Sequence, residues 1–350
     1  MIFFSIGLPG RFAEWCDLLV SRLAEEALGP THLIAGNNLE EIGLAVVKSQ
    51  GEHLVIGARQ PTASLRDALA TMACGFIIAL DDPRAALQNL VLRYGIEWTT
   101  ATRATASSCA SILAYSLLPQ ALVLRAHEDA RDPTATAMAI AGCFGLELDA
   151  AKIAACAASL PELSAGGTET GVEAWWNRIN PRDREIAAGA LMGYVEYFSG
   201  QGLGEIVWSR ELFLIGDDPQ QSAGGVIDLA GEVRNLLFGP YIALPPGVWS
   251  SAVSLAVSKD AAGMSFSIEI IAGPRCIPLA HATTAPDDQG LCQATLGFTV
   301  DSTTDQPIAF RIVNLHSASG GRLVLGEVAL TARTAPRAAI PVELSTALGL

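Results

Sequence analysis

The sequence predicts an α/β domain with a P-loop-type parallel sheet flanked by helices, followed by an antiparallel, jelly-roll-like β-sandwich. In residues 1–215, short apolar runs alternate with Ala-rich stretches whose apolar residues recur every three or four positions, as strands and helices do in alternation. From residue 226 onward, these stretches give way to short runs in which apolar and polar residues alternate, as in half-buried strands. With 350 residues, half of them hydrophobic, the chain can fill two cores.

The elements of the first domain are expected in order along residues 1–215. Strands are predicted at 2–6, 32–35, 53–56, 76–80 and 121–125, and helices at 13–28, 65–73, 84–94, 107–118, 133–144 and 181–198. Asp132-Pro133 and Asn180-Pro181 each place an N-cap residue before a proline at the first helical position. Short links between strand and helix favour a parallel sheet that is covered on both faces.

The second domain is expected over residues 226–334, after a Gly- and Asp-rich linker at 216–225. Strands are predicted at 226–229, 233–238, 247–257, 264–272, 292–300, 306–314 and 321–331. The regular spacing of the turns between them indicates a sandwich. Residues 335–350 are expected to form a loose tail.

The charge and the cysteine content exclude several classes of protein. The formal net charge is −14, and an acidic surface repels phosphate backbones, so no nucleic-acid partner is expected. No apolar run reaches the roughly 18 residues of a membrane-spanning helix, and the start of the chain lacks the basic region of a signal peptide. Seven cysteines without a Cys-x-x-Cys pair indicate free thiols in a reducing compartment, and hence a cytoplasmic location.

The first predicted strand runs into Gly7-Leu8-Pro9-Gly10 and then into a helix. A Gly-rich turn that leads into a helix N-terminus is a favourable place for a phosphate, because backbone N–H groups and the helix dipole attract an anion. The strict pattern that ends in Gly-Lys-Ser or Gly-Lys-Thr is absent. A tight structural turn is the alternative at this position.

These residues resemble a known family. Residues 7–15 look like the 5′-phosphosulfate loop of P-loop sulfotransferases, and residues 76–84 look like their second signature, a strand that ends in Arg-Asp-Pro-Arg. Residues 123–127, 132–140 and 143–146 resemble a later segment of the family. The resemblance implies the cofactor phosphoadenylyl sulfate (PAPS) in any active member. The cofactor-binding positions it implies are Gly7, Pro9, Gly10, Arg11, Phe12, Arg84 and Asn89.

The chain departs from the family at the positions that hold phosphate. Phe12 and Ala13 stand where the family has hydroxyl residues, and Asn89 stands where it has a serine. Asp81 replaces the arginine that holds the 3′-phosphate of the cofactor. A carboxylate at this position cannot form the charge-assisted hydrogen bond that an arginine gives to the 3′-phosphate, and it repels that phosphate. The sequence therefore predicts a degenerate nucleotide site.

Several other side chains are candidates for chemistry. Arg59 follows a strand at its carboxyl end, where open α/β sheets bind ligands, so with Arg11 and Arg84 it is expected to line an anion pocket. The alternative is that the three side chains are solvated or salt-bridged. If the chain is an active enzyme, His53 is the predicted base. Asp81-Asp82 fit either Mg²⁺ or, more simply, a helix N-cap before Pro83. No cluster has the spacing of a zinc site, so no metal is predicted.

In the second domain, Tyr241 and Trp249 flank a Pro-Pro-Gly turn. This stretch resembles a β-sandwich module attached to some bacterial proteins of surface-polysaccharide synthesis. Aromatic rings offer flat apolar faces that can stack on sugars, so both residues are predicted to bind substrate; ordinary sandwich core is the alternative.

Taken together, these features predict a sulfotransferase-like protein with a degenerate nucleotide site. Its expected partner is a glycan or glycoconjugate in bacterial surface-polysaccharide synthesis or modification. One alternative is an active PAPS-dependent carbohydrate sulfotransferase, and another is a structural assembly protein. Homo-oligomers and partner proteins of a synthesis complex are left open by the sequence.

Overall fold

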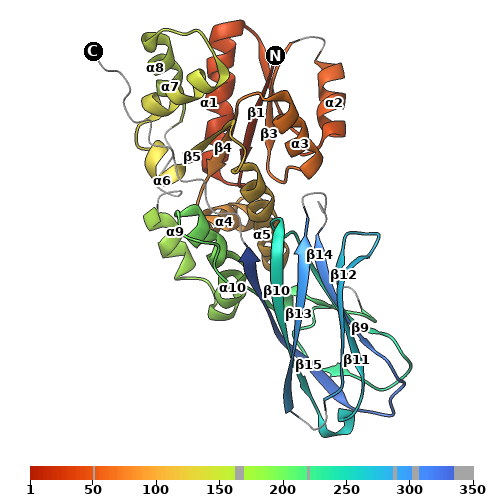
Figure 1. Ribbon diagram of the computed structural model, residues 1–350. Coiled ribbons are helices and arrows are strands. Elements are labelled where there is room, and N and C mark those ends of the chain that lie inside the picture. The colour runs from red at the N-terminus through yellow and green to blue at the C-terminus, as the bar shows by residue number, and fades with distance from the viewer. Residues whose placement is uncertain (50–51, 162–168, 219–220, 287–289, 302–306, 335–350) are drawn as a thin grey trace.

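The computed structural model describes residues 1–49, 52–161, 169–218, 221–286, 290–301 and 307–334. It confirms the predicted fold class, because a parallel sheet between helices is followed by two antiparallel sheets (Figure 1). None of the helices in these ranges combines the length and the apolar character needed to cross a membrane. The predicted tail at 335–350 lies outside the described residues.

The first domain alternates strands and helices, and all five predicted strands are confirmed. Its strands are β1 (Ile2–Gly7), β2 (Thr31–Ala35), β3 (His53–Ala58), β4 (Phe76–Leu80) and β5 (Ala121–Arg125). Its helices are α1 (Arg11–Leu28), α2 (Leu39–Lys48), α3 (Ala63–Met72), α4 (Pro83–Leu92), α5 (Trp98–Tyr115), α6 (Ala126–Asp129), α7 (Pro133–Phe144), α8 (Ala150–Ala158), α9 (Glu169–Trp176) and α10 (Pro181–Phe198).

The parallel sheet has the order β2-β3-β1-β4-β5 and a separate core on each face. On one face, Phe3, Val55 and Ile77 pack against α1, α7 and α8. On the other face, Phe4, Ile56 and Ile78 belong to the core that includes α3, α4 and α5. Alternate strand residues thus serve opposite faces, as expected for a doubly covered sheet.

The strand order reverses between β1 and β4, at whose carboxyl ends the β1–α1 loop and Asp81 follow. These two strands are neighbours, with Gly7 opposite Ala79. After β1 the chain continues to β2 at one edge of the sheet, and after β4 it continues to β5 at the opposite edge. Ligands of open α/β sheets bind where connections diverge in this way.

The second domain is a sandwich of two antiparallel sheets. Its strands are β6 (Ile206–Ser209), β7 (Leu214–Ile215), β8 (Ile227–Asp228), β9 (Asn235–Ile242), β10 (Gly247–Val257), β11 (Phe266–Ala272), β12 (Ile277–Thr284), β13 (Gly290–Val300), β14 (Ile308–Asn314) and β15 (Arg322–Thr334), with short helices η2 (Arg210–Leu212) and η3 (Lys259–Ala261). One sheet has the order β13-β10-β15-β6, with β8 beside β15, and the other has the order β12-β11-β14-β9-β7.

The sheets of the sandwich begin before the boundary predicted at residue 215. β6 pairs with β15, and β7 pairs with β9, so residues 206–215 belong to the second domain's sheets. The described part of the predicted linker also folds back, because Ala223 N donates to Phe213 O at 2.8 Å. The strand β12 had not been predicted, because Pro278 and the polar residues His281 and Thr283 interrupt its apolar pattern.

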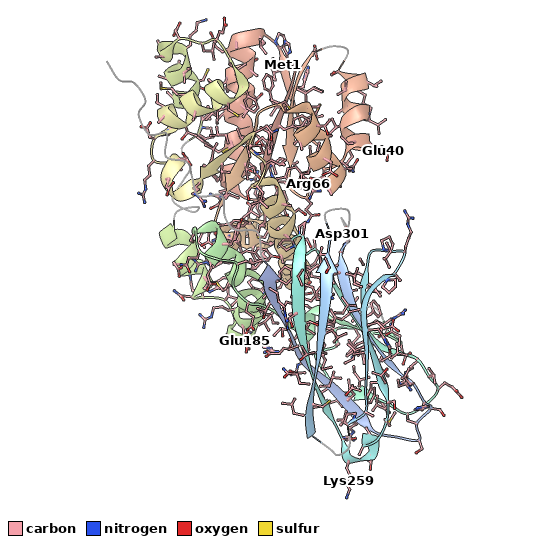
Figure 2. All side chains as sticks on the ribbon, in the orientation of Figure 1. Met1, Glu40, Arg66, Glu185, Lys259 and Asp301 are labelled. Atoms are coloured by element: carbon pink, nitrogen blue, oxygen red, sulfur yellow. The ribbon has the colours of Figure 1, made fainter. Side chains whose placement is uncertain are left out.

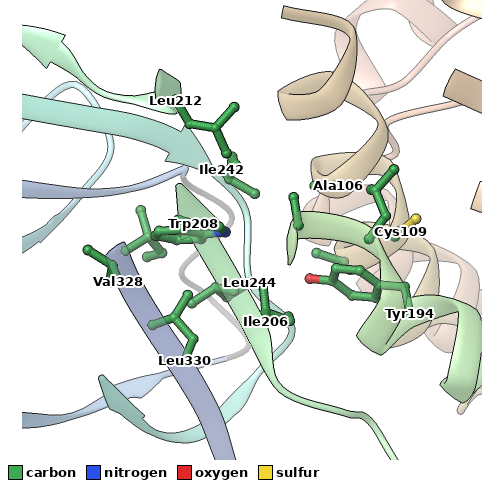
Figure 3. Close-up of a cluster of buried hydrophobic side chains, with 14 of the residues drawn as sticks. Ala106, Cys109, Tyr194, Ile206, Trp208, Leu212, Ile242, Leu244, Val328 and Leu330 are labelled. Atoms are coloured by element: carbon green, nitrogen blue, oxygen red, sulfur yellow. The ribbon is translucent and has the colours of Figure 1, made fainter. Parts of the chain in front are cut away.

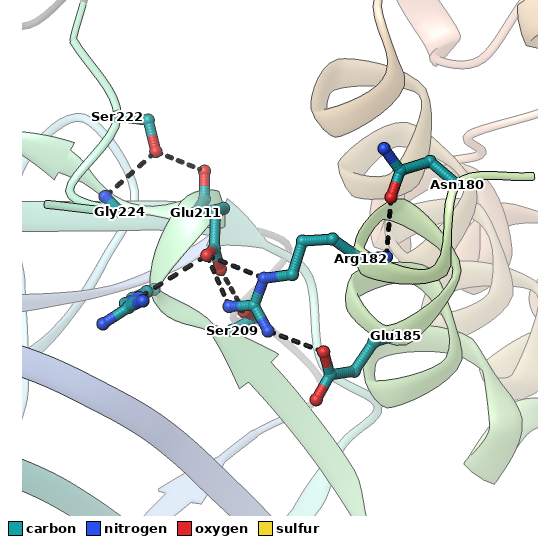
Figure 4. A network of polar contacts seen from close by, with 8 residues as sticks. Asn180, Arg182, Glu185, Ser209, Glu211, Ser222 and Gly224 are labelled. Carbon is teal, nitrogen blue, oxygen red and sulfur yellow. Dashed lines mark hydrogen bonds and ion pairs between the residues drawn. The ribbon is translucent and has the colours of Figure 1, made fainter.

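The two domains share a continuous apolar core. Figure 3 shows Tyr194 and Cys109 from the helices facing Trp208, Leu244 and Leu330 from the sandwich, and all of them are buried. A polar network also links α10 to the segment that begins the sandwich (Figure 4). There, Arg182 at the start of α10 pairs with Glu185 and with Glu211 of η2. The junction is therefore held by both apolar burial and ion pairs.

Candidate functional site

The loop between β1 and α1 has the shape of an anion site. A Cβ atom on Gly7 would lie 2.6 Å from the Cβ of Ala13 and 2.9 Å from the carbonyl oxygen of Ala79, so only glycine fits there. Gly10 is the N-cap of α1, and no side chain caps the helix. The first-turn N–H groups of α1 therefore have no side-chain cap.

Asp81, which follows β4, faces this loop. Its Oδ2 atom lies 3.3 Å from the position that a Cβ on Gly10 would occupy, and its Oδ1 accepts a hydrogen bond from Asp82 N at 2.8 Å. Burial raises the pKa of the Asp81 carboxyl to about 7, and the negative charge of Asp82 adds to the rise. No arginine or lysine in the described ranges forms an ion pair with Asp81.

Asp82 and Arg84 are engaged with each other and with α9. Asp82 caps α4 by accepting a hydrogen bond from Arg84 N at 2.8 Å, which confirms the N-cap alternative for this residue. The Arg84 guanidinium pairs with Asp82 at 2.7 Å and with Glu173 at 2.5 Å, and it lies over the ring of Trp176. No group of three or more metal-ligating side chains occurs within the described residues.

Arg59 is likewise engaged inside the protein. Its guanidinium forms an ion pair with Asp17, a buried residue of α1 that also accepts a hydrogen bond from Ser5 Oγ at 2.5 Å. Burial raises the pKa of Asp17, although the charge of Arg59 and the hydrogen bond from Ser5 act in the opposite direction. The structure therefore does not assemble Arg11, Arg59 and Arg84 into one anion pocket; Arg59 and Arg84 follow the salt-bridged alternative, while Arg11 starts α1 at the surface.

The remaining nucleotide-loop residues have structural contacts. Asn89 is buried and donates from Nδ2 to the carbonyl oxygen of Pro9 at 3.0 Å, so it holds the loop in place. Phe12 is buried and stacks with Trp15. His53 is at the amino end of β3, where Nδ1 lies 3.0 Å from the amino group of Met1. The structure thus places His53 at the edge of the sheet opposite the loop, and it is not positioned to act there as a base.

A pocket of about 380 Å³ lies between the two domains, beside the carboxyl end of β3. Its walls are the β3–α3 loop, one face of α5, and the sandwich segment 241–246 with Asp301 and Pro307. Figure 2 shows Arg66 and Asp301 on the two sides of this junction. Hydroxyl groups dominate the polar lining, and they belong to Thr62, Thr100, Ser107, Ser111, Tyr115 and Tyr241.

The sequence contained a signal for this pocket that was missed. The helix predicted at 107–118 begins instead at Trp98, where Glu97 caps it. Arg103, Ser107 and Ser111 are four residues apart along α5 and all line the pocket, as expected for one helix face. Arg103 donates from Nη2 to Leu212 O at 2.8 Å, and Ser107 Oγ accepts a hydrogen bond from Ala243 N at 3.2 Å. The lining residues therefore also join the domains.

The two aromatic residues predicted to bind substrate have different environments. Tyr241 is 44% exposed, has a φ of +61° and lines the pocket. Trp249 is 1% exposed, and its Nε1 donates to Pro245 O at 3.0 Å inside the sandwich. Trp249 cannot contact a ligand from this position, so its predicted role was wrong; the core alternative holds, because Trp249 is an inward residue of β10.

Comparisons with known proteins give weak similarities only. No family model and no curated protein sequence matches the chain. A mouse sulfotransferase complexed with PAP is 13% identical over 53% of this chain and 79% of that one, with a TM-score of 0.40. A Family 16 carbohydrate-binding module is 10% identical over 32% of this chain and 82% of the module, with a TM-score of 0.24.

A third similarity is to a cyclase from Fischerella sp. TAU in complex with 4-(1H-indol-3-yl)butan-2-one. It is 17% identical over 30% of this chain, with a TM-score of 0.24, and the match spans 59% of the cyclase's length. Identities and TM-scores this low do not bear on function. What the chain does must therefore be inferred from its own side chains: a glycine-containing loop that faces the Asp81 carboxyl, and a hydroxyl-lined pocket at the domain junction.

Proposed function

We propose that this protein binds a glycan or glycoconjugate in the pocket between its domains, as part of bacterial surface-polysaccharide synthesis or modification, and that its nucleotide loop is degenerate. The observation that carries the proposal is the lining of the pocket: hydroxyl groups, the amide of Gln60 and the guanidinium groups of Arg66 and Arg103 surround a cavity that Tyr241 borders. Sugars present many hydroxyl groups and flat apolar ring faces, and this mixture of hydrogen-bonding groups with an aromatic ring suits both. The volume falls in the usual range for small-molecule sites.

The fit of the β1–α1 loop to a phosphoadenylyl sulfate donor is poor, and this supports the degenerate site. Asp81 would place a carboxylate near the phosphates, and the charge of Arg84 is already shared between Asp82 and Glu173. The Asn89 amide is bonded to the loop itself. The Asp81 carboxyl, whose pKa is about 7, offers no positive charge to a phosphate and repels it when ionised. All seven cysteines are free thiols, which supports a reducing, cytoplasmic location.

The test is a glycan array followed by calorimetric titration of the strongest hits. Ser111→Trp should fill the pocket and abolish binding, and Tyr241→Ala should weaken binding by about tenfold. Ser111→Thr is the matched control, since it keeps the hydroxyl and adds one methyl group. Hits that bind equally well to the wild type, Ser111→Trp and Tyr241→Ala would place the glycan elsewhere and overturn the proposal.

An active sulfotransferase is the second candidate, because α1 has no side-chain cap and begins with a surface arginine, Arg11. Calorimetry with adenosine 3′,5′-bisphosphate separates the two functions. We expect no binding at micromolar concentrations; micromolar binding that disappears in Arg11→Ala would establish the nucleotide site instead. A protein that binds neither nucleotide nor any glycan fits the structural assembly role.

A further inference from the structure

A row of side chains crosses the β12-β11-β14-β9-β7 sheet and ends at the pocket. His281 of β12 is paired in register with Glu269 of β11, Glu269 with Arg311 of β14, and Arg311 with Phe238 of β9. Four neighbouring strands thus each contribute one residue at the same level. Because neighbouring strands are about 4.8 Å apart, the row is about 14 Å long.

The row lies on the face of the sheet that is turned away from the sandwich core. Glu269 stands between the buried Ile268 and Ile270, and Arg311 between the buried Phe310 and Ile312. Since side chains alternate across a strand, Glu269 and Arg311 point outward. Their side chains keep 26% and 37% of their exposure, and His281 is exposed. The polar side chains of the row are therefore partly accessible from solution, whereas Ser267 and Ala309, two residues earlier on the same face, are buried.

Tyr241 connects this row to the pocket. It follows Phe238 on β9, and the two rings meet edge to face with centroids 6.0 Å apart. Tyr241 also borders the pocket between the domains. Arg311 is in turn the register partner of Phe238 on the neighbouring strand. Pocket, Tyr241, Phe238 and Arg311 thus form one continuous path.

The chemistry of the row suits neutral sugars. Arg311 Nε donates to Glu269 Oε2 at 2.8 Å, so the two opposite charges are held together and offer both donors and acceptors without a net charge. Phe238 lies beside Arg311 on the next strand and Tyr241 lies beside Phe238, so two rings along the path offer faces or edges for stacking. A strongly anionic chain would meet Glu269 here and the acidic protein as a whole, whose net charge is −14.

We propose that this row is a second glycan subsite, which continues from the pocket over Tyr241 and binds successive units of a neutral, chain-like oligosaccharide. The inference rests on the proposed function, since the end of the oligosaccharide occupies the pocket. It adds the class of ligand: a chain several units long and without charge. A single sugar or a disaccharide fills only the pocket end of the path.

The experiment compares short and long probes. Calorimetry with β-1,4-linked and β-1,3-linked glucose fragments of two and six units gives the dependence of affinity on length, and a six-unit hyaluronan fragment is the anionic counterpart. We expect the better six-unit glucan to bind about tenfold more tightly than its disaccharide, and hyaluronan to bind more weakly than either glucan. Arg311→Gln should weaken the binding of the six-unit glucan about tenfold and leave the affinity for the disaccharide unchanged within about twofold.

Arg333→Gln is the matched control, because Arg333 is an exposed arginine on β15 of the other sheet. It should leave both affinities unchanged. Equal affinities for two and six units, or equal losses of both in Arg311→Gln, would refute the extended subsite and leave pocket binding standing. Tighter binding of hyaluronan would refute the neutral ligand. If array hits bind in the pocket but neither glucan series binds the protein, the chain-like neutral ligand is likewise refuted. If the array gives no hit at all, the proposed function itself is refuted.

Discussion

The two candidate regions of this protein lie at the same edge of the parallel sheet and differ in the polar groups that surround them. Around the β1–α1 loop, the arginines are bound to carboxylates of the protein: Arg59 to Asp17, and Arg84 to Asp82 and Glu173. Around the pocket, hydroxyl groups and an exposed ring border an open cavity. A tight glycine turn before an uncapped helix thus occurs here beside arginines that are already paired with carboxylates of the protein.

The largest effect on stability is expected when Trp249 is exchanged for alanine, and Tyr241→Ala is its counterpart at the pocket. Trp249→Ala should lower the free energy of unfolding by about 4 kcal/mol, because it empties a large volume in the sandwich core. Tyr241→Ala should cost less than about 1 kcal/mol, since the side chain is half-exposed. Urea unfolding measures both. A small loss in Trp249→Ala would contradict the core position of this residue.

The internal use of Arg59 is tested by Arg59→Met. Removing the guanidinium leaves Asp17 buried beside Ser5, which should cost about 3 kcal/mol at pH 8. The loss should shrink as the pH falls, because Asp17, whose pKa burial already raises, then takes up a proton. The double variant Arg59→Met/Asp17→Asn should recover most of the loss. An unchanged stability in Arg59→Met would show that the protein does not need the Arg59–Asp17 ion pair, and it would contradict the structural role given to Arg59 here.

Asp81 is tested by Asp81→Asn, which keeps an acceptor for Asp82 N. The pKa of Asp81 in the folded protein is about 7, so between about pH 4 and pH 7 the folded chain binds more protons than the unfolded one, and stability falls as the pH rises. Asp81→Asn should therefore raise the free energy of unfolding by about 2 kcal/mol at pH 8.

The gain in Asp81→Asn should vanish near pH 4, where the carboxyl is protonated in the folded protein. Urea unfolding at pH 8 and pH 4 gives the two values, and Asp82→Asn serves as a comparison, since it removes the α4 cap and should destabilise. A stability loss at pH 8 in Asp81→Asn would mean that a cation compensates Asp81, contrary to the degenerate loop.

The smallest effect is expected for His53→Gln. The ring touches the chain's first amino group at the far edge of the sheet, so the variant should change stability by less than about 0.5 kcal/mol. It should leave the affinity for every glycan hit unchanged in calorimetry. A reduced affinity would show that the amino edge of the sheet takes part in binding.

Local patterns predicted the architecture well, because strand and helix periods depend on near neighbours. All five parallel strands were found, and the alternation of Trp249, Val253 and Leu255 with smaller residues could also have shown that Trp249 points inward. The site was less predictable. The partner of Arg59 is 42 positions earlier in the chain, and Asp17 gives no sign of its burial in the sequence. The pocket needs residues of both domains at once, which no local pattern contains.

The shared apolar core has a consequence for how the chain unfolds and evolves. Trp208 and Ile206 sit in β6, which precedes the sandwich in sequence but completes its sheet, and both pack in the same cluster as Tyr194 of α10. The two domains should therefore unfold together in one cooperative transition. Recombination that moves this sandwich to a new host protein must likewise transfer the segment from Ile206 onward, or provide a substitute edge strand.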